Sequence, residues 1–307
     1  MTTTLKKTSG ITSQLVSSIL AIKPLANFAK YQARQMIIKH AEKIGLPWTE
    51  EVEKLKARSW EEDFTTVNNP HVSYPNYYLK SSFHAYEKSN LCWEAALEVE
   101  FAAMAVHSRI WKEAGIKGDA KLRQGYHDII KAQIHEPPRN IIDIGCGVGT
   151  STFALHMTYP QAEITGLDLS PYFLAVAHYR AQQCKDSINW VHAAAESTGL
   201  ANNTFDLVSM FLICHELPQS ATRYIYAEAR RLLRLGGYLT IMDMNPQAEA
   251  YRKMPPYILT LLKSTEPYID EYFTLDIKKA LTEAGFNPTT IIPNSPRHRT
   301  IIAKVCD

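Results

Sequence analysis

The sequence predicts an α/β fold with a seven-stranded, doubly wound, mostly parallel sheet whose last strand is antiparallel, preceded by an N-terminal helical region. Three observations support this prediction. Apolar segments alternate with helical segments from residue 136 onward, which is the pattern of a parallel sheet covered by helices. A turn with three glycines follows the first apolar segment. The last two apolar segments lie close together in the chain, so we expect them to pair antiparallel.

The predicted strands are short apolar runs, as expected for strands that are buried on both faces. They cover residues 141–144, 163–167, 188–191, 205–211, 237–242, 289–292 and 300–305.

The first part of the chain is expected to be helical. Apolar residues recur at helical spacing in segments that cover residues 11–38 (broken at Pro24), 91–114 and 121–134. The change in pattern falls before residue 136. We therefore predict a helical lid or substrate region over 1–135 and a sheet domain over 136–307.

The glycine turn follows the strand over 141–144, and its glycines are Gly145, Gly147 and Gly149. Glycine lets the backbone turn sharply and lets a ligand approach closer than a Cβ atom would allow. The segment 151–157 can be helical, and the start of a helix offers unpaired N–H groups to polar ligand atoms. A buried strand, a glycine turn and a helix together predict a nucleotide-type binding corner.

Two acidic residues bear on which nucleotide this corner binds. The spacing of the glycines differs from the dinucleotide fingerprint G-x-G-x-x-G, because the third glycine comes one place early and Asp143 lies inside the strand end. Asp168 ends the second strand, where a carboxylate can accept hydrogen bonds from both ribose hydroxyls. Alternatively, Asp168 caps the helix that starts near Pro171, a role that Ser170 could fill equally well.

Three motifs in the second half together resemble one family. The pattern D-x-G-C-G-x-G over 143–149 resembles motif I of the class I S-adenosylmethionine-dependent methyltransferases, which have a Rossmann-like fold. The segment 204–211, followed by C-H-E-L-P over 214–218, looks like their motif IV. The segment 230–239 resembles their turn into strand five, with Leu235 where proline is usual. Residues from about 120 to 307 are similar to this family, nearest to the small-molecule enzymes of quinone biosynthesis, and the front half looks like cyanobacterial and plastid members.

The resemblance implies S-adenosyl-L-methionine as the cofactor. Ala194 stands where the family has an acid that holds the adenine amino group, so the N–H of Ala195, or the side chain of Glu196 or His192, is expected to serve instead. The implied cofactor-binding residues are Asp143, Gly145, Cys146, Gly147, Gly149, Asp168, Leu169, Ala195, Glu196 and Phe211.

His215, just past the fourth strand, is the candidate catalytic base, because an oxygen or carbon acceptor must lose a proton and histidine titrates near neutral pH. Alternatively, His215 only shapes the turn and bonds to the backbone. Tyr74, His84 and Tyr86 are candidate substrate residues in the irregular segment 68–86. The alternative for this segment is a connector whose tyrosines pack on neighbouring helices. The five scattered cysteines argue against a zinc site, so no metal is expected.

The resulting prediction is an enzyme that methylates a small, apolar or aromatic molecule at oxygen or carbon. One alternative is a nicotinamide-dependent reductase, and another is a non-catalytic cofactor-binding protein that docks on a membrane through the basic segment 11–40. That segment could equally pack on the domain with a solvated basic face. A formal net charge of +2 gives no reason to expect nucleic acid as a partner. No apolar run reaches the roughly 20 residues of a membrane span, so a cytoplasmic location is expected, with membrane association left open.

Overall fold

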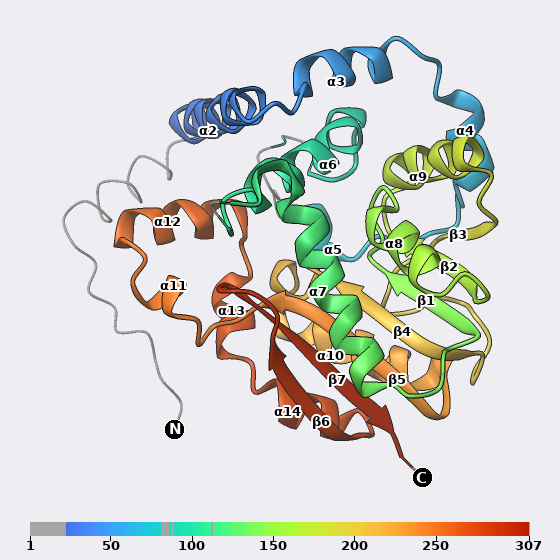
Figure 1. Ribbon diagram of the computed structural model, residues 1–307. Coiled ribbons are helices and arrows are strands. Elements are labelled where there is room, and N and C mark those ends of the chain that lie inside the picture. The colour runs from blue at the N-terminus through green and yellow to red at the C-terminus, as the bar shows by residue number, and fades with distance from the viewer. Residues whose placement is uncertain (1–22, 81–85, 87–88, 112, 307) are drawn as a thin grey trace.

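A central seven-stranded sheet organises the computed structural model, which describes residues 23–80, 86, 89–111 and 113–306 (Figure 1). The strand order is β3-β2-β1-β4-β5-β7-β6. Neighbouring strands from β1 to β5 are parallel, and β7 is antiparallel to both β5 and β6. The strands are β1 Asn140–Ile144, β2 Glu163–Asp168, β3 Ile188–His192, β4 Phe205–Phe211, β5 Leu233–Met244, β6 Phe286–Pro293 and β7 His298–Val305. The predicted fold class is confirmed.

The chain changes direction across the sheet beside β1. From β1 it proceeds outward to β2 and β3, and then returns to place β4 on the other side of β1. Ile142 of β1 accordingly pairs with Thr165 of β2 and with Val208 of β4. In open parallel sheets, ligands bind at the carboxyl ends of the strands near such a switch point. The glycine turn and His215 both follow strands that end at this edge.

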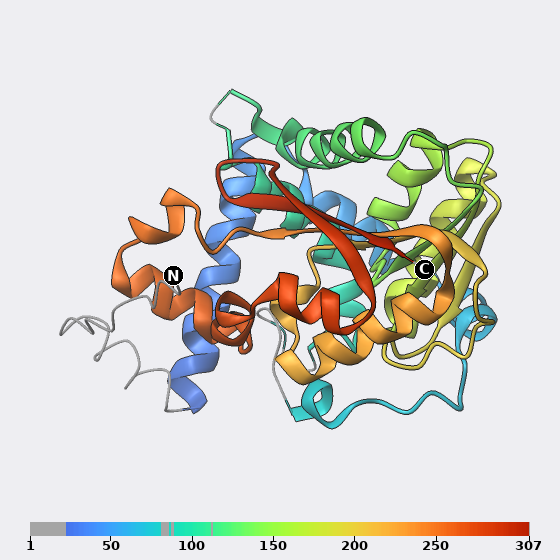
Figure 2. The same ribbon diagram turned by 90° about the horizontal axis from the view of Figure 1, so that it is seen from below.

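Helices cover both faces of the sheet (Figure 2). On one face, α7 and α8 pack in a cluster that includes Tyr126, Leu155 and Leu207. On the other face, α10 and α14 pack in a larger cluster that includes Ile225, Leu281 and Ile241. The helices of this part are α7 Gly118–Gln133, α8 Thr150–Thr158, α9 Pro171–Cys184, α10 Gln219–Leu232 and α14 Ile277–Glu283, with the short 3₁₀ turn η2 Cys214–Glu216 after β4.

The front helices pack on one another and on α9 (Figure 1). They are α2 Lys23–Lys43, α3 Trp48–Lys56, α4 Glu61–Val67, α5 Asn76–Lys80 and α6 Trp93–His107, followed by the 3₁₀ turn η1 Gly115–Lys117. Helix α2 buries Ala41 beside α3 and α6. Its residue Arg34 donates a 2.9 Å hydrogen bond from Nε to Oε2 of Glu98, which is 1% exposed. Pro24 lies in the first turn of α2, where proline is tolerated.

The predicted helix over 91–114 is too long. Helix α6 ends at His107 because the chain turns back there: a Cβ atom on Gly118 would lie 2.4 Å from the His107 carbonyl oxygen, and Asp119 accepts a 2.7 Å hydrogen bond at His107 Nδ1. The irregular segment 68–86 also contains a short helix, α5, that no periodicity predicted.

Three further helices that the sequence did not reveal lie between β5 and α14. They are α11 Glu249–Arg252, α12 Pro256–Thr265 and α13 Ile269–Thr274. They pass beside η2, and Tyr272 of α13 donates a hydrogen bond to the Met244 carbonyl at the end of β5. Within the described ranges, no helix is long and apolar enough to cross a membrane.

Candidate functional site

The glycine turn adopts a backbone that side chains disfavour. Gly145, Gly147 and Gly149 have φ values of 71°, 56° and 83°, in the left-handed region that glycine adopts readily. A Cβ atom on Gly145 would lie 2.6 Å from Ile213, but one on Gly147 would meet nothing closer than Phe173 at 3.9 Å. The turn is therefore packed from behind at Gly145 and open at Gly147.

Asp143 lies beneath this turn and is fully buried. Its Oδ2 accepts 2.8 Å hydrogen bonds from the hydroxyls of Ser151 and Thr152, at the start of α8, while Oδ1 has no hydrogen-bond partner among the described residues. Burial raises the pKa of this carboxyl. Asp143 thus fixes the turn to the helix that follows, and its direct contact with a cofactor stays a prediction.

Asp168 closes the turn from the end of β2. Its Oδ2 accepts a 2.8 Å hydrogen bond from the N–H of Gly147, and its Oδ1 accepts one of 2.8 Å from the N–H of Ser170. Burial raises the pKa of Asp168 to about 6, although these N–H groups favour the charged form. Ser170 caps α9 by accepting from the N–H of Phe173, so Asp168 is not needed as that cap.

The front segment lies across the ends of β2 and β3. The N–H of Asn69 donates a 2.9 Å hydrogen bond to Nδ1 of His192, and the hydroxyl of Tyr74 lies 3.2 Å from Nε2 of the same ring. His192 Nε2 is also 3.1 Å from the Leu169 carbonyl. Since Nδ1 accepts, Nε2 carries the proton, and burial lowers the pKa of His192. We call the contacts of Asn69 and Tyr74 with His192 the front clasp.

His215 lies on η2, shortly after the end of β4. Its Nδ1 lies 2.7 Å from Oδ1 of Asp243 at the end of β5, and its Nε2 lies 4.0 Å from Oε2 of Glu266. The partner of Nδ1 is thus a carboxylate, not the backbone. Burial alone would lower the pKa of His215, but the charge and hydrogen bond of Asp243, with the charge of Glu266, outweigh it and raise the pKa to about 10.

Two tyrosines of α5 bear on this edge of the sheet. Burial raises the pKa of the Tyr78 hydroxyl, and the charges of Asp168 and Glu216 raise it further. Its neighbour Tyr77 donates a 2.6 Å hydrogen bond to Oε1 of Glu196, just after β3. The glycine turn, Asp168 and His215 therefore belong to one continuous edge of the sheet, with α5 beside it.

The other predicted site residues lie in different places. The N–H groups of Gly145 and Cys146 bond to the Leu167 carbonyl, and Ala195 packs beside the larger core cluster. Phe211 lies in the core, with its ring 5.6 Å from that of Tyr126. The roles of these residues stay predictions.

Of the predicted substrate residues, Tyr74 belongs to the front clasp. Tyr86 lies among the front helices, where its hydroxyl donates a 3.2 Å hydrogen bond to Oε2 of Glu98. His84 falls outside the described residues.

Sequence reasoning missed Asp243 and Glu266. Asp243 could have been found as an acid at the end of a predicted strand, by the argument that identified Asp168. Glu266 carried no such signal, because α12 and α13 were not predicted and only the folded chain brings Glu266 to His215.

Comparisons with known proteins agree with this architecture. A family described as a methyltransferase domain matches residues 141–237. The malonyl-[acyl-carrier protein] O-methyltransferase of Hahella chejuensis is 38% identical over 106 residues, which are 33% of this chain and only 35% of that protein. The ubiquinone biosynthesis O-methyltransferase of Burkholderia pseudomallei is 26% identical over 167 residues, covering 53% of this chain and 70% of that protein.

A solved structure shares the fold. The phosphoethanolamine N-methyltransferase 2 of Haemonchus contortus, in complex with S-adenosyl-L-methionine, superimposes with a TM-score of 0.54 at 13% identity, over 73% of this chain and 62% of that chain. The motifs, the strand order and the matched segment lead to one conclusion. Residues 141–237 match a methyltransferase domain, and the sheet that contains them shares the fold of the solved methyltransferase.

Proposed function

We propose that this protein transfers a methyl group from S-adenosylmethionine to a small, apolar or aromatic acceptor, at oxygen or carbon. One observation carries the proposal: the glycine turn with Asp168 and the buried His215 follow neighbouring parallel strands and lie along one edge of the sheet. A donor site and an acceptor site in direct succession are what methyl transfer needs, because acceptor and methyl must be aligned and water excluded.

The described residues fit this cofactor. A Cβ atom on Gly147 would touch only Phe173, at 3.9 Å, and Asp168 presents a carboxylate beside this glycine, suited to ribose hydroxyls. When bound, S-adenosylmethionine supplies a methyl group that is already activated by its sulfonium. The chain therefore has to hold the donor, exclude water and handle the proton of the acceptor.

His215 marks the acceptor end of the site. Asp243 fixes its ring, and the raised pKa of His215 favours the protonated imidazole. A protonated imidazole cannot accept a proton. The hypothesis that His215 is a general base therefore requires that something first displaces the proton from Nε2.

The name of one relative, an O-methyltransferase of ubiquinone biosynthesis, supports methyl transfer to oxygen on a small acceptor. Another relative is named for malonyl-[acyl-carrier protein] as its acceptor. The reductase alternative is not favoured, because residues 141–237 match a methyltransferase domain and β7 closes the sheet antiparallel between β5 and β6.

Calorimetric titration with S-adenosylmethionine and, separately, with NADPH tests the proposal. We expect micromolar binding of S-adenosylmethionine that Asp168→Ala abolishes, and then methyl transfer from labelled donor to members of a panel of quinols and phenols. Binding of NADPH alone would overturn the proposal. Binding of S-adenosylmethionine with no transfer to any acceptor would favour a non-catalytic cofactor-binding protein.

Peripheral membrane contact through residues 11–40 is a secondary proposal. Residues 11–22 lie outside the described part of the chain. On α2, Met36 and Lys39 are exposed, but Arg34 pairs with Glu94 and Glu98, so one of the basic groups is engaged within the protein. Flotation with anionic vesicles tests this contact. We expect the protein to float with the vesicles, and its absence from the floating fraction would contradict the proposal.

A further inference from the structure

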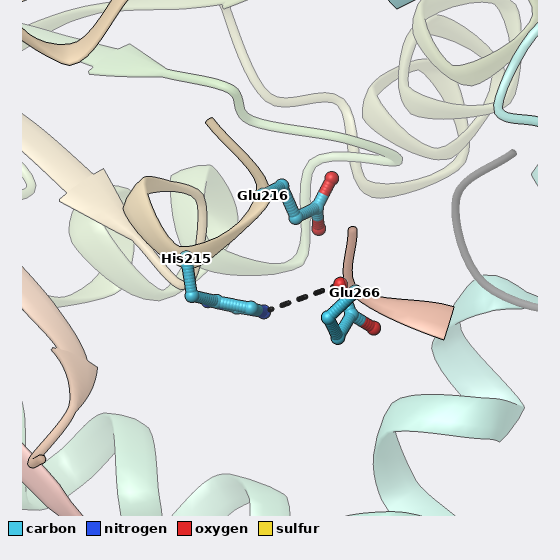
Figure 3. A group of neighbouring side chains, drawn as sticks. All are labelled: His215, Glu216 and Glu266. Carbon is cyan, nitrogen blue, oxygen red and sulfur yellow. Dashed lines mark ion pairs between the residues drawn. The ribbon is translucent and has the colours of Figure 1, made fainter. Parts of the chain in front are cut away.

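Three side chains meet beyond the end of β4. His215 and Glu216 come from η2, and Glu266 comes from the end of α12. One ligand atom from each of them lies within 4.8 Å of the others. Figure 3 shows the imidazole of His215 directed at Glu266, with Glu216 beside them. Imidazole and carboxylate are both good ligands for divalent metal ions.

The second observation concerns the burial and the hydrogen bonds of the His215 ring. The residue is 9% exposed and its side chain 11%. Its Nδ1 is held by Asp243, which in turn accepts hydrogen bonds from the N–H groups of Cys214 at 2.8 Å and Met244 at 2.6 Å. Nε2 makes no hydrogen bond to any described residue. A metal-binding histidine usually donates its other ring N–H to a carboxylate in this way, which fixes the ring and makes it more basic.

The spacing also suits an ion. The 4.0 Å between His215 Nε2 and Glu266 Oε2 is too long for a hydrogen bond. Zinc binds nitrogen and carboxylate oxygen at about 2.0–2.2 Å, so an ion between these two atoms would keep them at or slightly below their present separation. The charges agree too, since two carboxylates balance one divalent cation.

We propose that His215, Glu216 and Glu266 bind a divalent transition-metal ion of the Mn²⁺ or Zn²⁺ type, with Asp243 positioning His215. The mixed imidazole and carboxylate ligands favour such an ion over Mg²⁺ or Ca²⁺, which prefer oxygen ligands alone. Three protein ligands leave coordination positions open, as in catalytic rather than structural sites.

The consequence for catalysis rests on the proposed function. A metal ion at this site would bind an acceptor hydroxyl and lower its pKa, so that the proton could leave to water. Metal binding to Nε2 also requires that the imidazole loses its second proton. A free imidazole base would then not be needed, and the acceptor would be an oxygen compound that can bind the metal.

The full-length protein, stripped with EDTA and dialysed, is titrated with MnCl₂ while free Mn²⁺ is followed by electron paramagnetic resonance, and with ZnCl₂ by calorimetry. We expect one tight equivalent. Glu266→Gln and His215→Ala should each weaken binding by at least roughly tenfold, and Asp243→Asn by roughly 10- to 100-fold. Glu249→Gln is the matched control, because Glu249 is an exposed glutamate on α11 that pairs with Lys253, and it should bind as the unmodified chain does.

Circular dichroism and thermal unfolding, measured on every variant, report that the chain is folded. Absence of metal binding, or binding that Glu266→Gln and His215→Ala leave unchanged, would overturn the metal site. Failure of the proposed function would be a separate result. A protein that binds the metal as expected but neither binds S-adenosylmethionine nor transfers methyl groups would support the metal site and contradict the proposed function.

Discussion

At the scale of single residues, Asp168 makes a prediction about pH. This carboxylate is 8% exposed, and burial raises its pKa to about 6. If its charged form accepts the ribose hydroxyls, affinity for S-adenosylmethionine should fall as the pH falls through 6, by about tenfold between pH 7 and pH 5. Calorimetric titration across this range measures the effect, and an unchanged dissociation constant would contradict it.

The matched control is Asp168→Asn, which keeps the shape but cannot titrate. It should bind more weakly and show no pH dependence over the same range. The effect on folding has the opposite sign. Since the folded-state pKa is raised above the roughly 3.9 of an unfolded aspartate, the protonated carboxyl favours the fold. Its contribution to stability is present below about pH 4 and is lost as the pH rises through 6.

At the scale of elements, two substitutions in the glycine turn should distinguish effects on stability from effects on cofactor binding. Gly147→Ala places a Cβ atom in ordinary contact with Phe173 at 3.9 Å, so only the positive φ is strained, at a cost of about 1–2 kcal/mol. We expect the fold to survive and the affinity for S-adenosylmethionine to fall sharply. Gly145→Ala adds a clash with Ile213 at 2.6 Å and should lose about a further 1–3 kcal/mol of stability. Thermal unfolding and calorimetric titration measure the two effects.

Ile213→Ala provides the control for this pair. In a Gly145→Ala background it removes the nearest clashing atom, so part of the lost stability should return. If Gly147→Ala binds S-adenosylmethionine as well as the unmodified chain, the turn does not lie against the cofactor, and the donor site would have to be sought elsewhere.

The same elements show what sequence can predict. Each buried strand is a local apolar run, and the glycines and Asp168 stand at fixed places relative to strand ends, so the sheet and the position of the glycine turn beside Asp168 were predictable. Residues 245–275 have no strong period, and their helices take their positions from tertiary contacts such as Tyr272 with the Met244 carbonyl. The position of Glu266 beside His215 therefore could not be predicted from the sequence. Asp143 was recognised as a site residue, but its hydrogen bonds to Ser151 and Thr152 depend on the folded turn.

At the scale of the whole molecule, the question is how the front half is coupled to the sheet. The boundary between 1–135 and 136–307 stays a prediction. Its test is complicated by α7, whose Tyr126 bonds to Ser209 at 3.0 Å and to Thr240 at 2.7 Å within the sheet. Ahead of α7, several contacts lead from the front segments to the rest of the described chain. Arg180 of α9 pairs with Glu100 of α6, and His178 of α9 lies 3.0 Å from Asp63 of α4. Tyr77 donates a hydrogen bond to Glu196, and the front clasp joins Asn69 and Tyr74 to His192.

The front clasp gives the prediction at this scale. His192→Phe keeps an aromatic ring but removes the acceptor of the Asn69 N–H, which costs about 1–3 kcal/mol when the donor is left unpaired. Backbone amides over 69–78 should then exchange with solvent at least about tenfold faster, and S-adenosylmethionine should bind more weakly because this segment lies beside Asp168. Acid should also speed the exchange, since a protonated Nδ1 cannot accept the hydrogen bond from Asn69.

Hydrogen exchange followed by mass spectrometry makes the measurement. His71→Phe, at an exposed position in the same segment, is the control. Equal exchange in His192→Phe and the unmodified chain would contradict the prediction and mean that other contacts, such as that of Tyr77 with Glu196, hold this segment.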